Sequence, residues 1–224
     1  YIQAVQRPNT APKIGFSMDL GGFAVIDNDM KSHLLGALDT LAAAGAELEE
    51  ITPDTSSLYD TYHTLRGVMW ATGAKILPGH IRPNWKSTLE DNTTFGERLT
   101  VDQITDAQIN RSRLYTNMLK IFDRVDVLAL PVVGCMPHPQ SEEWVRSIGG
   151  VTLDGYMDWL SFAYLATVTS LPAMSVPVGL GPNGIPVGIQ LIGRPRDEAG
   201  LLQVAAFVET VMGGPLSPID PVQR

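Results

Sequence analysis

Serine side chains are the first candidates for chemistry, because a hydrolase without a metal needs an activated nucleophile. The segment Gly15-Phe16-Ser17-Met18-Asp19 comes nearest to a nucleophile elbow, but it lacks the second glycine of the sharp strand-to-helix turn. No serine has a lysine three residues later, so the Ser-x-x-Lys pattern is missing too. The sequence therefore offers no activated serine, and we assign no catalytic residue.

A thiol and an imidazole lie three residues apart at Cys135 and His138, and such a pair could in principle activate the thiol. Pro137 and Pro139 flank the histidine and no third orienting group is evident, so a loop at the end of a strand is the favoured interpretation. The histidines have no His-Glu-x-x-His spacing and no paired cysteines, so no metal site is predicted. They are His33, His63, His80 and His138.

The charge of the chain argues against a nucleic-acid partner. Its 224 residues carry a formal net charge of -8, and its 16 Lys and Arg residues are scattered without a basic stripe. No apolar run approaches the roughly 20 residues that span a bilayer, so we expect a soluble chain without a membrane partner. The single cysteine, Cys135, gives no sign of an oxidising compartment and favours a cytoplasmic location.

The elements that would position a site begin with a strand, a helix and a strand. Residues 13–17 form a short apolar run, residues 27–45 carry Leu34, Leu38 and Leu41 at helical spacing, and residues 47–51 predict a second strand. A helix between two strands predicts a right-handed crossover and parallel pairing. The expected fold class is therefore α/β, with helices packed on a sheet.

Two further helices are expected before the third strand. Residues 57–74 have a helical pattern, after which Pro78, Gly79 and Pro83 break the chain and a loop with Trp85 follows. Residues 102–123 form the clearest helix, with Asp102 as its expected N-cap.

The last part of the chain predicts a mixed sheet. Residues 126–133 are a nearly continuous apolar run, which is typical of a buried strand. After a surface excursion over 134–155 and a helix over 156–168, two strands at 173–178 and 187–192 flank Asn183-Gly184 and should pair antiparallel. A final helix is expected over 197–212.

Residues 167–209 resemble the C-terminal segment of the amidase signature family. In that family a Gly-x-Pro-Ala segment leads into a Ser-Val-Pro strand, a turn, a Gly-Leu-Pro-Val-Gly-Leu-Gln-Leu-x-Gly strand and a Glu-x-x-Leu-Leu helix. Residues 171–177, 184–193 and 198–202 match these features in order and spacing. Ala107-x-x-x-Arg111 and Asp126-Val-Leu-x-x-Pro131 are similar to upstream landmarks of the family, so the resemblance spans nearly the whole chain.

This resemblance implies acyl transfer by a serine that a second serine and a lysine activate, without metal or organic cofactor. In the family those residues lie in the N-terminal half, and nothing in this chain matches the Gly/Ser-rich loop that accompanies them. We therefore expect one α/β region over 1–224, the C-terminal half of an amidase, with 1–12 as a linker from a missing N-terminal half. Such a half hydrolyses no amide alone; the N-terminal half is its expected partner, and exposed strand edges also favour self-association. The alternative is a non-catalytic domain that binds a small amide or a partner chain.

In such an enzyme, this half would contribute part of the substrate pocket. The family's helix equivalent to 156–168 lies near the substrate, which makes Trp159, Phe162, Tyr164 and Thr167 the expected substrate-binding residues, although aromatic residues on a helix can equally be core. Thr167 and Ser170 stand where the family often has Asn and Gly, which leaves the substrate class open. Arg98 lies in a region where some members hold a substrate carboxylate, but the match is poor and a surface arginine is favoured.

Overall fold

The computed structural model describes residues 1–182 and 184–214. Its main sheet has the strand order β2-β1-β3-β7-β6. β1 (Lys13–Phe16) pairs parallel with β2 (Glu47–Glu50) and with β3 (Val127–Pro131), whereas β7 (Pro186–Gly193) pairs antiparallel with both β3 and β6 (Ala173–Leu180). The expected mixed sheet is confirmed. The Asn183 part of the expected turn lies outside the described residues, while Gly184 has the positive φ of 70° that such a turn requires.

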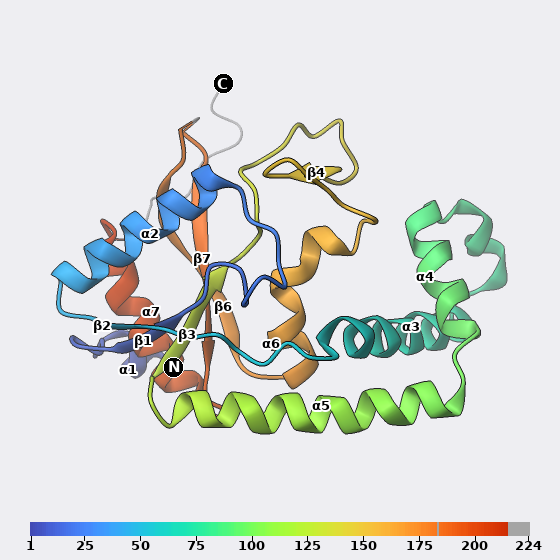
Figure 1. Cartoon of the computed structure of the whole chain (residues 1–224), viewed down its shortest axis with the longest axis horizontal. Helices are drawn as coiled ribbons and strands as arrows, with labels where there is room; N and C mark the ends of the chain where they lie inside the picture. The colour runs from blue at the N-terminus through green and yellow to red at the C-terminus, as the bar shows by residue number, and fades with distance from the viewer. Residues whose placement is uncertain (183, 215–224) are drawn as a thin grey trace.

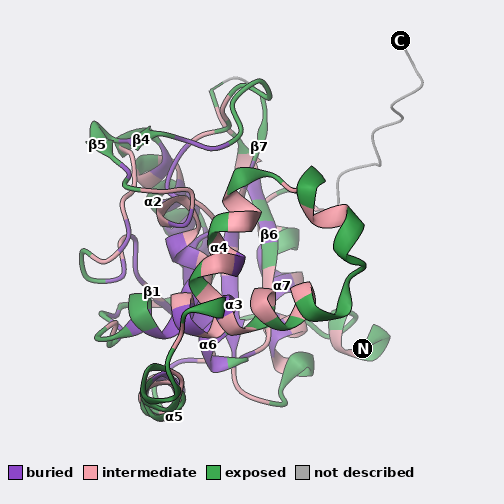
Figure 2. Ribbon diagram, turned by 90° about the vertical axis from the view of Figure 1, so that its right-hand side faces the viewer, coloured by how far each residue is buried: buried purple, intermediate pink, exposed green. Residues whose placement is uncertain are grey.

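Helices cover both faces of the sheet (Figure 1). α2 (Asn28–Ala43) and α7 (Glu198–Val211) pack on one face, while α5 (Val101–Phe122) and α6 (Tyr164–Thr169) pack on the other. Each face of the sheet has its own hydrophobic core, and successive side chains of β3 point to opposite faces. Val127 and Ala129 belong to the core under α2 and α7, while Leu128 and Leu130 belong to the core under α5 and α6. Figure 2 shows these central strands buried, whereas α5 is largely exposed on its outer surface.

The first crossover is stabilised at its helix start. Asp27 accepts a hydrogen bond from the backbone N–H of Met30 at 2.6 Å and so caps α2. The other carboxylate oxygen of Asp27 accepts from the N–H of Met136 at 3.2 Å, in the segment that follows β3. One side chain thus fixes both the start of α2 and the path of the chain beyond β3.

A helical lobe stands beside the sheet, and part of it differs from the sequence prediction. α3 (Leu58–Ile76) is close to the expected helix, and Trp85 lies in a short non-helical link. This link joins two elements that the sequence pattern did not predict, the 3₁₀ helix η1 (Gly79–Asn84) and α4 (Ser87–Glu97). The α4 sequence has few apolar residues at helical spacing, and the helix depends on close packing: a β-carbon on Gly96 would overlap the carbonyl oxygen of Gly67 on α3.

The N-cap of α5 also differs from the prediction. Thr100, and not Asp102, caps the helix: its hydroxyl accepts from the N–H of Gln103 at 3.2 Å, while the Gln103 side chain accepts from the N–H of Thr100 at 2.9 Å. This reciprocal pair is a capping box, and the N-cap lies two residues before the expected one.

The connection between β3 and β6 is more ordered than the expected surface excursion. A small hairpin of β4 (Ser147–Ile148) and β5 (Val151–Thr152) forms within it, and Trp144, Val145 and Leu153 join Cys135 in a separate small core. The helix expected over 156–168 is divided into the 3₁₀ helix η2 (Asp158–Ala163) and α6.

The first residues of the chain lie against its last described helix. α1 (Ile2–Val5) packs on α7, and the backbone N–H of Asn9 donates to the carbonyl of Gln203 at 3.2 Å. The Asn9 side-chain amide also donates to Asp126 at 3.3 Å. Whether residues 1–12 serve as a linker stays a prediction.

Candidate substrate-binding site

Aromatic side chains of α3 and α6 stack where the helical lobe meets the body of the protein. Tyr59 stacks on His63 with ring centroids 4.0 Å apart, and Tyr62 stacks on Tyr164 with centroids 3.7 Å apart. Tyr59, Tyr62 and His63 occupy one side of the first turns of α3, because residues three and four apart share a helix face. We call these four residues the aromatic cluster.

Hydrogen bonds fix the orientation of the cluster. The Tyr164 hydroxyl donates to the carbonyl of Met157 at 2.8 Å, and its oxygen lies 3.3 Å from His63 Nε2. Because the Tyr164 proton is used by Met157, the phenol oxygen is left to accept from His63. The contact therefore favours a proton on Nε2 of His63.

The electrostatics of the cluster agree with a neutral imidazole. Burial lowers the pKa of His63 below 6.5, against the opposing effect of the Asp158 and Asp60 carboxylates. Burial also raises the pKa of Tyr164 far above its usual value of 10.0, so its hydroxyl keeps its proton and remains a donor. The cluster is thus an uncharged hydrogen-bonded surface near pH 7.

A cation closes one side of the cluster. Arg66 donates to the hydroxyls of Tyr62 and Tyr156, each at 3.3 Å, and its guanidinium lies 5.6 Å from the centre of the Trp70 ring. Among the residues described, Arg66 forms no salt bridge with an acid. Aromatic faces and phenol oxygens are its partners here.

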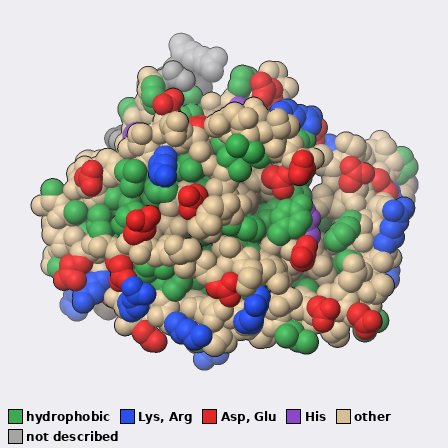
Figure 3. Space-filling view, in the orientation of Figure 1, with side chains coloured by type: hydrophobic (Ala, Val, Ile, Leu, Met, Phe, Trp, Pro, Cys, Tyr) green, Lys and Arg blue, Asp and Glu red, His purple; other side chains and the backbone are tan. Residues whose placement is uncertain are grey.

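A cavity of about 450 Å³ opens beside the aromatic cluster. Tyr59 and His63 form one wall and Asp158 and Tyr156 another. Trp144, which precedes the β4–β5 hairpin, also lines the cavity. Figure 3 shows acidic side chains around exposed hydrophobic ones on the face in view. Most of the remaining lining residues are polar or charged, among them Asp91, Glu143 and Arg146, so the cavity combines aromatic rings with a polar wall.

A second cavity, of about 380 Å³, lies between Met30 of α2 and the start of β7. Trp159, Cys135 and His138 line it, and the rings of His138 and Trp159 are perpendicular with centroids 5.0 Å apart. Burial raises the pKa of the Cys135 thiol, the Asp27 carboxylate adds to the rise, and the neighbouring Trp159 indole opposes it. The Cys135 thiol keeps its proton and makes no hydrogen bond to His138 among the described contacts. Cys135 and His138 therefore do not form an activated dyad.

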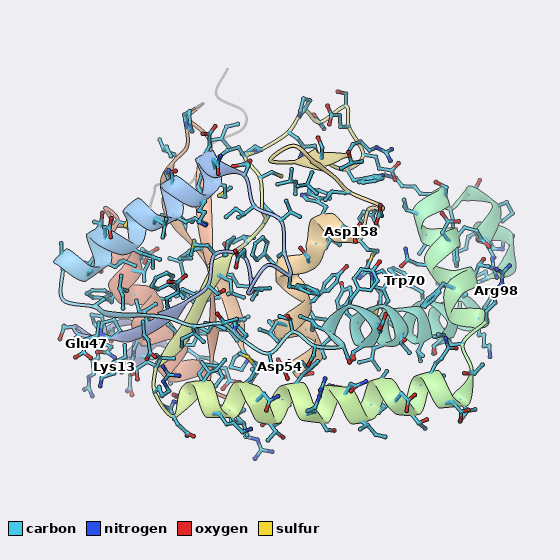
Figure 4. The ribbon with its side chains drawn as sticks, in the orientation of Figure 1. Lys13, Glu47, Asp54, Trp70, Arg98 and Asp158 are labelled. Carbon is cyan, nitrogen blue, oxygen red and sulfur yellow. The ribbon has the colours of Figure 1, made fainter. Side chains whose placement is uncertain are left out.

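The four residues expected to bind substrate are not gathered in one cavity. Trp159 is half-buried and lines the second cavity, whereas Phe162 and Tyr164 are buried in the core. Thr167 is exposed, and its hydroxyl donates to the carbonyl of Ala163 at 2.8 Å. Their role in substrate binding stays a prediction. Arg98 is exposed at the end of α4, and Figure 4 places it on the outside of the lobe, away from Asp158.

Tyr59, His63 and Arg66 are the site residues that sequence reasoning missed. Their spacing of three and four residues, with Tyr62 between them, puts all of them on adjacent faces of one helix, and that signal was present in the sequence. The contact of His63 with Tyr164 could not be inferred from that spacing, because the two residues are 101 apart along the chain.

Two landmark residues of the family hold the segment next to the site. Arg111 donates through Nε to the carbonyl of Val168 at 2.9 Å and through Nη2 to the hydroxyl of Ser170 at 2.7 Å, at the end of α6. Gln190 on β7 donates to the carbonyl of Phe162 at 3.2 Å, at the end of η2. Ser170 has a φ of 54°, in the left-handed region where glycine is favoured, so the glycine common in the family has a conformational reason.

Neither metal coordination nor a membrane span is found in the part of the chain that the structure describes. No group of three or more His, Cys, Asp or Glu side chains there could hold a metal ion. None of the helices described is both long and apolar enough to cross a membrane.

Comparison with known proteins identifies the family. The family model for amidases matches residues 1–202, and the chain belongs to the amidase family. A solved bacterial aryl acylamidase of the amidase signature enzymes has the same fold, with a TM-score of 0.81 at 21% identity over 96% of this chain and 48% of that one.

Two curated relatives show how much of the family's length is present. The chain is 30% identical to a fatty acid amide hydrolase of Oryza sativa subsp. indica over 193 residues, which are 83% of this chain and 31% of the relative. It is also 24% identical to an acylamidase of Rhodococcus erythropolis over 219 residues, which are 94% of this chain and 44% of the relative. The chain therefore spans less than half of each of these relatives.

Proposed function

We propose that this chain is the C-terminal portion of an amidase that hydrolyses a carboxylic amide to an acid and ammonia or an amine. Family membership carries this proposal, together with the match of residues 167–209 to the family's pattern. We infer that catalysis belongs to an upstream portion with two serines and a lysine, because no serine in the described part of the chain has a hydrogen bond to a lysine or histidine side chain. Ser17 illustrates this: its buried hydroxyl accepts from the N–H of Leu20 at 3.1 Å and serves a turn.

The contribution of this chain to the enzyme is scaffold and part of the substrate pocket. Trp159 is the strongest of the proposed substrate-binding residues, since it lines a cavity beside the η2 backbone. Phe162, Tyr164 and Thr167 are proposed to act with Trp159. The buried residues Phe162 and Tyr164 would do so by holding the wall of the cavity in place. The proposed partners are a small amide substrate and an N-terminal half that adds strands to the sheet beyond β6. We also propose that the enzyme is cytoplasmic and that it needs no cofactor.

The test compares the chain alone with the chain joined to, or mixed with, the preceding half of its own coding sequence. We expect a panel of simple aliphatic and aromatic amides to release ammonia or amine only when both halves are present. Turnover by the 224-residue chain alone would contradict the assignment of catalysis to the upstream portion. No turnover by the complete protein would instead favour a non-catalytic binding domain.

A matched pair of variants tests the pocket residue in the active two-part protein. We expect Trp159→Phe to raise KM several-fold with a smaller change in kcat, because it removes contact area from the cavity wall. Trp85→Phe, in the helical lobe, is the control and should leave both constants unchanged. Equal effects of the two variants would remove Trp159 from the substrate pocket.

A further inference from the structure

One carboxylate holds the backbone of two residues that line the second cavity. Asp27 Oδ1 accepts a hydrogen bond from the N–H of Met30 at 2.6 Å, and Asp27 Oδ2 accepts one from the N–H of Met136 at 3.2 Å. Met30 lies in the first turn of α2, Met136 follows β3, and both residues line the cavity. Asp27 is not among the described residues that line it, so any effect of Asp27 on the cavity passes through these neighbours.

The chain segment after β3 depends on Asp27 for its position. The N–H of Asp27 donates to the carbonyl of Gly134 at 2.7 Å, and a β-carbon on Gly134 would overlap the carbonyl oxygen of Val25. Beyond Gly134, residues 135–138 form part of the cavity wall. Among the described contacts, the bond from Met136 to Asp27 is the only backbone hydrogen bond that this stretch makes. The carboxylate therefore fixes where that part of the wall lies.

The position of this stretch affects the shape and the chemistry of the cavity. The ring of His138 packs perpendicular to the ring of Trp159, with centroids 5.0 Å apart, so a shift of the stretch would change this contact. The cavity is mainly apolar: Met30, Met136 and Val187 line it, and no Asp, Glu, Lys or Arg is among the described lining residues. An uncharged apolar group is therefore what it can accommodate, because a charged group would lose its hydration without compensation.

Capping a helix does not require the second oxygen of Asp27. Asp197 caps α7 by accepting from the N–H of Gly200 at 3.0 Å, and among the described contacts its side chain makes no hydrogen bond outside that helix. In Asp27, one oxygen caps α2 in the same way. The other oxygen reaches Met136, which is 109 residues further along the chain.

We propose that Asp27 is a positioning residue for the substrate pocket: it places Met136 and its neighbours so that the second cavity accepts the apolar group of an amide substrate. This inference rests on the proposed function, in which the second cavity is part of the pocket. It assigns no chemical step to Asp27. Loss of the Met136 bond weakens the binding of amides with a bulky apolar group and spares small amides, which have little to place in the cavity.

The substitution Asp27→Asn separates the two bonds of the carboxylate. Asparagine caps helices as well as aspartate does, so its amide oxygen can still accept from the N–H of Met30. Its NH₂ group is a donor and cannot accept from the N–H of Met136. Asp27→Ser is a second variant, because its one hydroxyl oxygen also caps a helix but cannot serve both N–H groups. Asp197→Asn, the same change at the cap of α7, is the control.

The first measurement is hydrogen exchange of single amides in the 224-residue protein. We expect the Met136 amide to exchange about tenfold faster in Asp27→Asn, because a hydrogen bond to a charged acceptor is lost, while the Met30 amide keeps its rate. Asp197→Asn should change neither rate. An unchanged rate at Met136 in both Asp27 variants would overturn the proposal. Loss of folding in both variants would overturn it too, since Asp27 would then serve the fold as a whole.

The second measurement is kinetic and uses the complete two-part protein with benzamide and acetamide. We expect Asp27→Asn to raise the KM for benzamide several-fold with little change in kcat, and to leave both constants for acetamide unchanged. A merely structural role would lower the activity toward the two amides alike. Equal effects on benzamide and acetamide, or no effect on either, would therefore overturn the proposal, as would the same pattern in Asp197→Asn.

Failure of the proposed function would be seen separately, as no turnover of any amide by the unmodified complete protein. Calorimetric titration of that protein with benzamide then decides about Asp27. A Kd that rises in Asp27→Asn and not in Asp197→Asn supports the proposal. An equal Kd in the two variants, or no measurable binding of benzamide, overturns it.

Discussion

Arg111 joins two elements through one side chain. It holds the last turn of α6 by the carbonyl of Val168 and the hydroxyl of Ser170, a residue whose left-handed backbone disfavours any side chain. The family landmark Ala107-x-x-x-Arg111 therefore has a structural meaning in this chain: its arginine fixes the segment that leads into β6.

We expect Arg111→Ala to lower the free energy of unfolding by about 2 kcal/mol, because it removes two hydrogen bonds from a charged donor. In that background, Ser170→Gly should restore about 1 kcal/mol, since glycine adopts the left-handed conformation without cost. Urea denaturation measures both effects. Lys120→Ala, an exposed change on the same helix, is the control; an equal loss in that variant would show that Arg111 has no special role.

His63 should give the stability a dependence on pH. Its folded pKa lies below the ordinary 6.5, so as the pH falls through 6.5 the unfolded chain takes up a proton before the folded one does. The contribution of neutral His63 is complete above pH 6.5 and is lost as the pH falls toward the folded pKa. We expect His63→Gln to flatten this part of a denaturation profile measured from about pH 5 to about pH 8. A profile unchanged by the substitution would contradict this assignment.

At the scale of elements, the contact of α3 with α4 depends on two glycines. A β-carbon on Gly96 would overlap the Gly67 carbonyl, so we expect Gly96→Ala to force the helices apart and to cost about 1–3 kcal/mol. Hydrogen exchange should then become faster in α4 and η1 and remain unchanged in the sheet. Gly73→Ala is the control: nothing lies near its added carbon, and alanine should stabilise α3 by up to about 1 kcal/mol. Equal effects at both positions would exclude a packing role for Gly96.

The same lobe shows where sequence reasoning succeeds and where it ends. Periodicity predicted α2, α5 and β3, because their apolar residues repeat with the period of the element and face a core. It missed α4, whose stability comes from the Gly67–Gly96 contact and from the salt bridges of Arg82 with Glu90 and Glu97, at 2.7 and 2.9 Å. These interactions join residues that no local pattern connects.

The candidate site was predicted less completely than the fold. Trp159 does line a cavity, but the sequence could not show that Tyr164 turns into the core, because that direction is set by stacking on Tyr62 from another helix. The prediction of Asp102 as the α5 cap was wrong for a similar reason. Both residue types start helices, and the reciprocal bond of Gln103 decides between them.

At the scale of the whole molecule, β6 ends the described sheet with one edge unpaired. An open edge strand is a template for pairing with another chain, so we expect the 224-residue protein to self-associate in sedimentation velocity experiments. Ala173→Lys should reduce the association, because it places a charge on that edge, whereas Ala42→Lys, an exposed change on α2, should not. A monomer at all concentrations would show that β6 is already protected.

The long helix α5 has a consequence for how this protein can vary in length. Its first half faces α3 through Ala107 and Asn110, and its second half packs under the sheet through Leu114 and Met118. One residue inserted between these halves would turn one set of contacts by about 100° relative to the other. Viable insertions or deletions in the middle of this helix are therefore those of about seven residues, two whole turns, which restore the angular phase of both surfaces.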